Sequence, residues 1–348
     1  MYEQGVIRPP SEAASLLVRV SRNCPWNQCV FCPAYKGTKF SKRTVDEVKK
    51  DIDVMAAEHR GVRVTSAFLQ DADSLLLPTG DLIAILEYLR EKFPKIDRIT
   101  TYARARTLKR KSVDDLRSLG EAGLTRVHAG LESGSETVLK LIKKGLTPEE
   151  IVTGGRHVMD AGLELSEYVM PGIGGRALSE EHAVETAKVL NLVRPHFIRI
   201  RTFAMHPKSP MQRMVEEGTF VPMTDVEIVG EIRLLVDHLD KMHSYFSCND
   251  FSLNLLMEVD GFLDEKKDLM LRELDAFLAL SERQKRVYIL LQRSGYYRYP
   301  LSVVEDEAVL NRVVPEIEKL EKEGGGFDRY IDVLKSYQLP QPQTDDWQ

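Results

Sequence analysis

Short apolar runs alternate with amphipathic stretches over the first two-thirds of the chain. The runs are rich in β-branched and aromatic residues, and they are short, as expected for buried strands of a parallel sheet. The longer stretches between them have the pattern of amphipathic helices. The alternation predicts six strands: Leu16–Ser21, Thr65–Gln70, Arg98–Ala103, Arg126–Leu131, Glu164–Met170 and Phe197–Phe203.

Four helix starts are marked by a hydroxyl residue that is followed three positions later by an acid. In such a capping box the hydroxyl accepts one free backbone N–H of the first turn, and the carboxylate accepts another. The pairs are Thr44 with Glu47, Ser112 with Asp115, Thr147 with Glu150, and Thr224 with Glu227. The first three fall between predicted strands, so they support a series of strand–helix units.

Six strand–helix units in series imply an α/β fold with a parallel sheet and right-handed crossovers. They are too few to close an eight-fold barrel. We therefore expect a partial (β/α)6 TIM-like barrel over residues 1–221, with its working site at the carboxyl ends of the strands. A mostly helical C-terminal extension is expected over residues 222–338 and a disordered tail over residues 339–348. The predicted helices of the extension are Thr224–Met242, Asp264–Leu280 and Val304–Glu323.

Composition and charge are those of an ordinary globular protein. Of the 348 residues, 43% are hydrophobic and 29% charged, and the formal net charge is −5. This mildly acidic balance gives no general attraction for nucleic acid or for an anionic membrane. No apolar run is long enough to span a bilayer, and the N-terminus lacks the segments of a signal peptide. We expect a cytoplasmic protein, in a reducing compartment where free thiols survive.

Three of the four cysteines, Cys24, Cys29 and Cys32, lie in one short segment. Only Cys248 lies elsewhere, which leaves no sensible set of paired disulfides. Three thiolates in one loop offer three of the four ligands of an iron–sulfur cube and leave one iron open. A zinc site would need a fourth Cys or His ligand, and a redox pair of Cys29 and Cys32 would leave Cys24 without a role. The spacing favours the cluster, with zinc as the main alternative.

The cysteine loop follows the first predicted strand and has Phe31 before its last cysteine, and in this it resembles the loop of the radical S-adenosylmethionine (SAM) enzymes. Those enzymes most often have three residues between the first two cysteines, whereas this chain has four. Segments 70–73, 130–135 and 203–211 resemble the loops that approach the SAM methionine, ribose and adenine. Taken whole, the chain is similar to the oxygen-independent coproporphyrinogen oxidase and methylthiotransferase groups, and we expect it to lack their extra modules.

The resemblance implies two cofactors: a [4Fe-4S] cluster held by Cys24, Cys29 and Cys32, and SAM bound at the open iron. One electron would cleave SAM to methionine and a 5′-deoxyadenosyl radical, which takes a hydrogen atom from the substrate. It also implies a flavodoxin or ferredoxin as reductant, and an oxygen-sensitive protein. From the arginines near the strand ends we expect the substrate to be a small, carboxylate-bearing metabolite or cofactor precursor.

The same resemblance suggests cofactor contacts for residues at or near the predicted strand ends. These are Phe31, Asp71, Asp73, Glu132, Ser133, Gly172, Arg201 and Met205. Several have a structural alternative. Phe31 could instead be an ordinary core aromatic, Asp73, Glu132 and Ser133 could cap helices, and Arg201 could lie on the surface.

Three further residues are candidates for catalysis. Tyr102 and Arg104 end the third predicted strand, where the guanidinium could hold a carboxylate of SAM or of the substrate. Cys248 could donate a hydrogen atom or serve as a fourth ligand before SAM binds, but a buried free cysteine is usually a small hydrophobe. His128 and His206 lie near strand ends as well, as proton carriers or as structural histidines.

Two other functions stay open at this point. In residues 283–299, basic side chains are interleaved with aromatic ones, among them Tyr296, Tyr297 and Tyr299. Such a segment would fit an RNA-modifying enzyme. The acidic net charge argues against nucleic acid, and a solvated helix face explains the basic residues equally well. A non-catalytic metal-binding scaffold would fit the cysteines, but it would not need the SAM-like loops.

Overall fold

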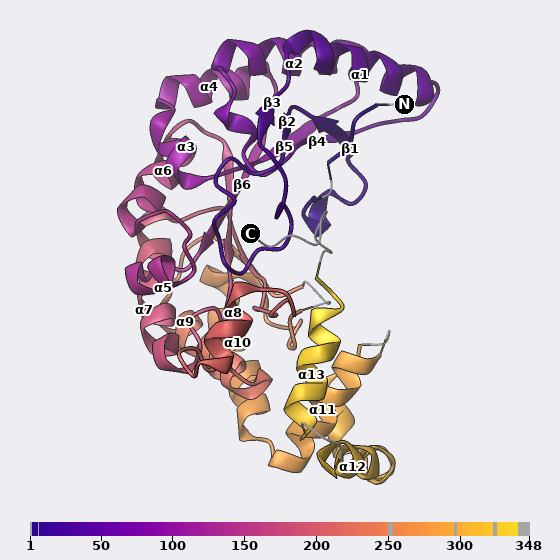
Figure 1. The fold of residues 1–348 in the computed structure, drawn as a ribbon, viewed down its shortest axis with the longest axis vertical. Coiled ribbons are helices and arrows are strands. Elements are labelled where there is room, and N and C mark those ends of the chain that lie inside the picture. The colour runs from indigo at the N-terminus through magenta and orange to yellow at the C-terminus, as the bar shows by residue number, and fades with distance from the viewer. Residues whose placement is uncertain (1, 6, 250–252, 296–297, 323–325, 340–348) are drawn as a thin grey trace.

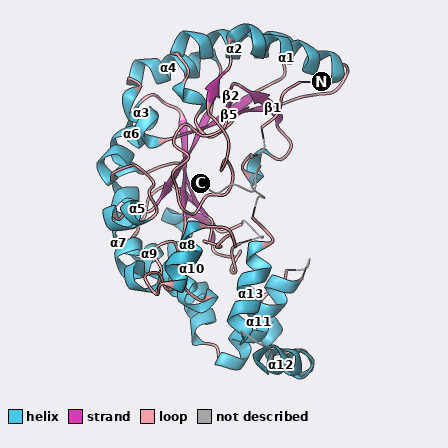
Figure 2. Ribbon diagram, viewed as in Figure 1, coloured by secondary structure: helices cyan, strands magenta, loops and turns pink. Residues whose placement is uncertain are grey.

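The computed structural model describes residues 2–5, 7–249, 253–295, 298–322 and 326–339. Its centre is an eight-stranded sheet in the order β1-β4-β5-β6-β7-β8-β9-β10. Every neighbouring pair is parallel except β9 and β10. Figures 1 and 2 show the strands curving inside an arc of helices that is open on one side. The predicted α/β partial barrel is therefore confirmed.

The strands lie close to where the sequence predicted them. They are β1 (Leu16–Arg19), β4 (Ser66–Gln70), β5 (Arg98–Ala103), β6 (Arg126–Glu132), β7 (Glu164–Val169), β8 (Phe197–Ile200), β9 (Tyr245–Ser247) and β10 (Asp260–Phe262). The first six correspond to the six predicted strands. β9 and β10 lie beyond residue 222, where a mostly helical extension was expected and no strand was predicted, so the sheet runs across the predicted domain boundary. Each has only three residues, too few for an apolar pattern to mark.

Helices cover the outer face of the sheet (Figure 1), and alternation along the strands explains why. In β6, Val127, Ala129 and Leu131 belong to the main apolar core, so Arg126 and His128 between them face the inside of the barrel. The helices up to the end of the sheet are α1 (Val45–Glu58), α2 (Thr79–Lys92), α3 (Ala105–Arg110), α4 (Val113–Ala122), α5 (Glu136–Leu141), α6 (Pro148–Asp160), α7 (Ser179–Val193), α8 (Pro210–Glu216) and α9 (Asp225–His238).

All four predicted capping boxes are present, at the starts of α1, α4, α6 and α9. At α1 the Thr44 N–H donates to the Glu47 carboxylate over 2.7 Å, and the Glu47 N–H donates to the Thr44 hydroxyl over 3.2 Å. Each box involves residues only three positions apart. These helix starts therefore follow from local sequence, without help from the rest of the fold.

The C-terminal helices are joined to the barrel by a buried salt bridge. They are α10 (Leu263–Ala279), α11 (Glu282–Ser294), α12 (Glu307–Lys322) and α13 (Gly326–Ser336). Asp225, the first residue of α9, accepts two hydrogen bonds of 2.9 Å from Arg293 of α11 and lies 3.4 Å from Lys335 Nζ of α13. Burial would raise the pKa of Asp225, but the two cations hold it well below its usual range.

Residues 283–294 of the segment in which basic and aromatic side chains are interleaved lie in α11. Tyr288 is fully buried in it. Arg286 forms an ion pair with Glu321 of α12, and Arg293 forms one with Asp225 of α9. These contacts use the basic side chains to hold the C-terminal helices in place, which supports the structural interpretation of this segment over an RNA surface.

Part of the C-terminal prediction falls outside the described residues, namely Tyr296, Tyr297 and the tail from residue 340 onward. The three helices predicted beyond residue 222 correspond to α9, α10 and α12, and the structure adds α11 and α13. Within the described ranges, none of the helices combines the length and the apolar character that a bilayer span requires.

Candidate active site

The cysteine loop lies directly after β1, and its base is closed by a small antiparallel pair, β2 (Ser21–Arg22) with β3 (Ser41–Lys42). At its start the Asn23 N–H donates to Asp71 Oδ2, just after β4, over 2.9 Å. The same oxygen accepts from Arg19 Nε of β1 over 3.0 Å. The loop is therefore fastened at the carboxyl ends of β1 and β4, the end at which barrels of this kind carry their chemistry.

Cys24, Cys29 and Cys32 are all half-buried on this loop. The Asn27 N–H, in a left-handed turn with φ 47°, donates to Cys24 Sγ over 3.4 Å. Burial, together with the charges of the other two cysteines, raises the pKa of the Cys32 thiol to about 12. The thiols are thus close enough to interact, and binding to a metal would replace their protons.

Two neighbouring segments hold the outer side of the loop. Trp26 Nε1 donates to the Lys143 carbonyl, between α5 and α6, over 2.8 Å. Arg104, just after β5, donates to the Lys144 carbonyl over 2.9 Å, and its guanidinium lies 5.1 Å from the centre of the Trp26 ring. Gly145 permits this packing, because a Cβ there would lie 2.3 Å from the indole. The loop is thus fixed to the α5–α6 turn as well as to the strands.

A buried ion pair lies beside the cysteines. Lys144 Nζ is 2.7 Å from Glu132 Oε1, and the two side chains are 11% and 12% exposed. Glu132 ends β6 with φ 59°, and Gly130 leaves the space that its carboxylate fills. Burial would lower the pKa of Lys144, but Glu132 and Cys29 raise it. A fixed ammonium and a fixed carboxylate therefore flank the thiols.

A second apolar cluster, separate from the main core, covers the carboxyl ends of the strands. Its buried members are Val30, Val138, Ile142, Ile173, Phe203, Met211 and Phe220. Phe31 and Met205, both predicted cofactor contacts, pack against this cluster with part of their surface exposed. Ser209 Oγ donates to the Val30 carbonyl over 2.7 Å, which joins the loop after β8 to the cysteine loop.

Aromatic rings follow one another around the inside of the barrel, one each from β4 to β7: Phe68, Tyr102, His128 and Tyr168. Successive ring centres are 5.1, 6.0 and 6.2 Å apart. Nδ1 of His128, Thr100 Oγ1 and Ser247 Oγ are buried and have no hydrogen-bond partner among the described residues. Because buried polar groups are normally paired, a bound polar molecule or water would complete these sites.

The amino end of the barrel is closed by the N-terminal segment. Glu12, at the end of the short 3-10 helix η1 (Pro10–Glu12), is fully buried. It accepts from Ser15 Oγ over 2.6 Å and lies 3.2 Å from Arg98 and 3.5 Å from His128 Nε2. Burial lowers the pKa of His128, although Glu12 acts in the opposite direction. A molecule would therefore enter the interior from the carboxyl ends of the strands.

A second buried network supports the loops after β6 and β7. Ser133 Oγ lies 2.8 Å from Nδ1 of His182 in α7, whose Nε2 lies 3.6 Å from Glu231 Oε1 in α9. The same Glu231 oxygen accepts the Gly172 N–H over 2.7 Å. Burial lowers the pKa of His182 to about 4 and raises that of Glu231 to about 7. Ser133 and Gly172, both predicted cofactor contacts, thus have partners inside the protein.

Residues 18–190, which contain the cysteine loop and the Lys144–Glu132 pair, match the family model of the radical SAM superfamily. The chain belongs to the radical SAM superfamily. The predicted family is thereby confirmed, and with it an enzyme that uses a [4Fe-4S] cluster and SAM. A non-catalytic scaffold and a zinc site are no longer needed to explain the cysteines.

The proteins that resemble this chain carry names for different reactions. An uncharacterised methyltransferase of Pyrococcus horikoshii is 29% identical over 182 residues, which cover 51% of this chain and 37% of the relative. The tRNA-2-methylthio-N(6)-dimethylallyladenosine synthase of Syntrophobacter fumaroxidans is 27% identical over 225 residues, covering 62% of this chain and 47% of the relative. The structure of coproporphyrinogen III oxidase from Escherichia coli has 17% identity and a TM-score of 0.46, covering 59% of this chain and 51% of that one. The chain spans less than half the length of either curated relative, so they leave its substrate open.

The residues at the radical SAM loop fit the family's cofactors. Thiolates are the donors that iron–sulfur clusters prefer, and each cysteine of a cube binds a different iron. The three thiols therefore need to lie close to one another, but they need not be placed to bind one shared metal ion. Within the described part of the chain, no three His, Cys, Asp or Glu side chains are placed to hold a single metal ion. Lys144 and Glu132 interact with Cys29 and match the charges of an amino acid, and Phe31 with Met205 offers apolar surface to a purine.

Asp71 and Asp73 both have partners within the protein. Asp71 holds the start of the cysteine loop through Asn23. Asp73 accepts the Arg104 N–H over 3.2 Å and the Thr107 hydroxyl over 2.6 Å, so it fastens the start of α3, and its side chain makes no capping hydrogen bond to the turn at Ser74. Burial raises the pKa of Asp73 to about 6. Direct contact with SAM stays a prediction for both residues, while the structure gives each a positioning role.

The other predicted side chains separate into two groups. Tyr102 lies inside the barrel, where burial raises the pKa of its phenol well above its usual value and the Arg201 charge acts in the opposite direction. Arg104 instead packs on Trp26 and donates to the Lys144 carbonyl, and its charge acts on Cys29. His206 is buried, and its Nδ1 accepts the Lys208 N–H over 3.1 Å, which supports its structural interpretation.

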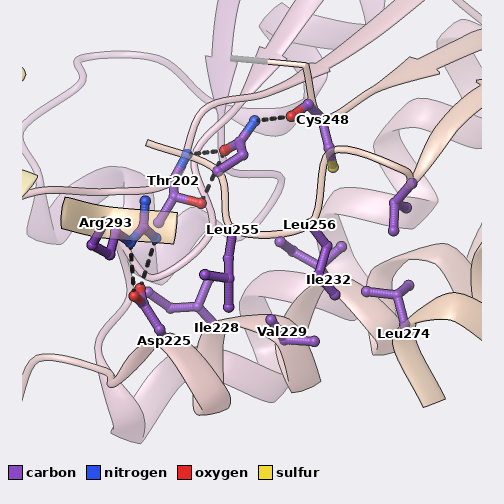
Figure 3. A pocket seen from close by; sticks show the side chains of 12 residues that line it. Thr202, Asp225, Ile228, Val229, Ile232, Cys248, Leu255, Leu256, Leu274 and Arg293 are labelled. Carbon is purple, nitrogen blue, oxygen red and sulfur yellow. Dashed lines mark hydrogen bonds and ion pairs between the residues drawn. The ribbon is translucent and has the colours of Figure 1, made fainter. Parts of the chain in front are cut away.

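Cys248 lies on the outer face of the sheet. It belongs to the main apolar core, and Figure 3 shows its sulfur in a small cavity that is also lined by Ile232 of α9 and Leu274 of α10. Its carbonyl accepts from Asn254 Nδ2 over 3.0 Å. Burial raises the pKa of this thiol well above its usual value. These surroundings support a small buried hydrophobe over a hydrogen-atom donor or a cluster ligand.

Sequence reasoning missed Lys144 and Trp26. Lys144 meets Glu132 across the whole of α5, twelve positions along the chain, so no local spacing marks the pair. Trp26 lies inside the cysteine loop, and a large aromatic among polar residues could have been noticed there. Its packing on Gly145 could not, because it joins positions more than a hundred residues apart.

Proposed function

We propose that the chain cleaves SAM reductively and uses the resulting 5′-deoxyadenosyl radical to abstract a hydrogen atom from a small polar substrate inside the barrel. The observation that carries this proposal is the cysteine loop. Three half-buried thiols are fastened at the strand ends beside the Lys144–Glu132 pair. Cys24, Cys29 and Cys32 would hold the cluster, which would supply the electron for cleavage of the S–C5′ bond of SAM.

The surrounding residues would bind and orient SAM and keep water out. The Lys144 ammonium and the Glu132 carboxylate suit the two charged groups of its methionine end, because charge-assisted hydrogen bonds fix orientation as well as affinity. Phe31 and Met205 would cover the adenine. Val30 and Phe203, buried in the same apolar cluster, would exclude water from the radical.

The interior of the barrel would hold the substrate. Its ring-lined wall includes Tyr102 and His128, and Arg199 and Arg201 follow on the adjoining strand end. Cations beside unpaired polar atoms favour an anionic substrate, such as the predicted carboxylate-bearing metabolite or cofactor precursor. Because Glu12 closes the far end, the space suits a small molecule.

Formation of 5′-deoxyadenosine tests the proposal. The protein is reconstituted anaerobically with iron and sulfide and then given SAM and dithionite. Wild type should form 5′-deoxyadenosine, and Cys29→Ala should not, whereas Cys248→Ala should match the wild type. A deuterated substrate should pass its label to 5′-deoxyadenosine, which identifies the substrate. Full activity in Cys29→Ala, or none in the loaded wild type, would contradict the proposal.

A second candidate is RNA modification, favoured by the relative whose name describes a tRNA-modifying synthase. The basic residues of α11 are already engaged with Asp225 and Glu321, which argues against that helix as the RNA surface. Parallel label-transfer assays with deuterated tRNA and with a deuterated metabolite pool separate the two candidates. Label arriving from tRNA alone would favour the second.

We further propose that a flavodoxin or ferredoxin supplies the electron, and that the enzyme works in a reducing cytoplasm because its cluster is oxygen-sensitive. Half-buried cysteines support this, since a cluster on them would be reached by oxygen. Exposure of the reconstituted protein to air should bleach the cluster absorbance and abolish activity. A stable absorbance in air would contradict the oxygen sensitivity.

A further inference from the structure

An open hollow of about 330 Å³ lies on the outer side of the cysteine loop. Its lining includes Trp26, Arg106, Lys140, Lys143, Gly145 and Leu146. These residues come from the cysteine loop, from α3, from α5 and from the turn between α5 and α6. We call this feature the Trp26 hollow. It is the outward-facing side of the wall that encloses the thiols.

The Trp26 ring is held rigidly while it stays half exposed. Its N–H donates to the Lys143 carbonyl over 2.8 Å, and Arg104 lies over the ring at 5.1 Å. The indole also packs closely on Gly145, where a Cβ would clash with it. A rigid, partly exposed aromatic adds contact area with little loss of entropy. Trp and Arg are enriched at the energetic centres of protein interfaces for this reason.

The side chains around the hollow carry a net positive charge, although the chain as a whole carries a net charge of −5. Four cations, Arg104, Arg106, Lys140 and Lys143, line the hollow or lie over Trp26, and two carboxylates, Glu136 and Glu150, pair with them, a local balance of +2. Lys140 pairs with Glu136 at 2.7 Å, and Arg106 pairs with Glu150 at 3.1 Å. The Lys140–Glu136 pair is exposed on both sides, and such pairs are worth at most about 1 kcal/mol, so Lys140 can turn to a partner.

We propose that the Trp26 hollow is the docking surface for an acidic protein that carries single electrons. The inference rests on the proposed function, which consumes one electron for each SAM cleaved. In each transfer the carrier is oxidised by one electron and the cluster is reduced by one, with no atom exchanged. Trp26 is two residues from Cys24 and three from Cys29, so a carrier in the hollow would dock directly on the loop that carries the thiols. Opposite charge would steer it there.

Charge reversal on the rim tests the inference through binding alone. The double variant Lys140→Glu/Lys143→Glu is compared with Lys241→Glu, whose lysine likewise pairs with a carboxylate at 2.7 Å and is exposed. The probes are a purified flavodoxin and a purified ferredoxin, and the Kd is measured by calorimetry. At low salt the double variant should bind its carrier about tenfold more weakly than the wild type, while the control should match the wild type. High salt should remove most of that difference.

Several outcomes would overturn the inference. One is the same Kd for the wild type and the double variant; another is wild-type binding weaker than about 1 mM for both carriers. A third is that tRNA binds to the wild type but not to the double variant, while neither carrier binds to the wild type. The hollow would then be a surface for nucleic acid.

Activity assays separate this inference from the proposed function. Dithionite needs no docking surface, so the double variant should form 5′-deoxyadenosine with dithionite at the wild-type rate. Only the rate driven by the carrier should fall. If the wild type forms no 5′-deoxyadenosine with dithionite, the proposed function fails, and the Kd comparison still decides whether the carrier docks.

Discussion

Neutralising Asp225 tests how the C-terminal helices stabilise the fold. Its carboxylate is 2% exposed and the Arg293 side chain 4%, so both charges lie out of water. Two hydrogen bonds of 2.9 Å join them, and Lys335 Nζ lies 3.4 Å away. Asp225→Asn leaves two buried cations facing a neutral amide. Breaking a buried pair on one side costs about 3–5 kcal/mol, and we expect the free energy of unfolding to fall by that amount.

The effect of this substitution should reach the active site. Arg293 also donates to the Leu253 carbonyl over 2.9 Å. The next residue, Asn254, accepts the Thr202 N–H over 3.0 Å (Figure 3). Thr202 begins the loop that carries Met205 over the strand ends. We therefore expect the variant to bind SAM more weakly than the wild type while it keeps the same iron content.

Urea denaturation followed by circular dichroism measures the stability, and calorimetry measures SAM binding. The matched control is Asp268→Asn, which removes an exposed pair with Lys241 of 2.7 Å and should cost less than about 1 kcal/mol. Because the cations lower the pKa of Asp225 in the folded state, its contribution is present above pH 3.8 and is lost as the pH falls below that value. Equal losses in Asp225→Asn and Asp268→Asn would refute this reasoning.

Three other substitutions probe separate parts of the structure. Burial raises the pKa of Glu167 to about 8, so stability is greatest below its usual pKa of 4.5 and falls as the pH rises to 8. Between pH 6 and 9 the loss should be about 3 kcal/mol, and it should disappear in Glu167→Gln; parallel stability curves would contradict this. Gly145→Ala should change the Trp26 fluorescence and lower the iron content, whereas Gly162→Ala, with φ 78° and open space around it, should add backbone strain alone. Lys144→Met should weaken SAM binding about tenfold by calorimetry, with recovery in Lys144→Arg; unchanged affinity would remove Lys144 from the SAM site.

Local patterns in the sequence were enough to predict most of the fold. The four capping boxes each involve residues three positions apart, and the first six strands are apolar runs with clear ends. β9 and β10 were missed because a strand of three residues is too short to show an alternation of apolar and polar positions. They are strands only because β8 and the helices around them provide partners, which is information that tertiary structure alone supplies.

The candidate site was predictable only in part, for a similar reason. The cysteines were found because three thiols in one loop are a local signal. The partners of Asp71 and Asp73 were not, because Asn23, Arg104 and Thr107 lie 31 to 48 positions away along the chain. Residue type and position near a strand end suggested cofactor contacts. The fold uses these carboxylates first to position loops.

Electron paramagnetic resonance of the reduced protein tests the central claim most directly. Dithionite-reduced, reconstituted protein should give the signal of a [4Fe-4S]⁺ cluster, and the addition of SAM should change that signal because SAM binds at the iron that no cysteine holds. The Cys29→Ala protein should show neither the signal nor the change. A full cluster signal in the wild type that SAM leaves unaltered would contradict the claim that the three cysteines leave an iron open to SAM.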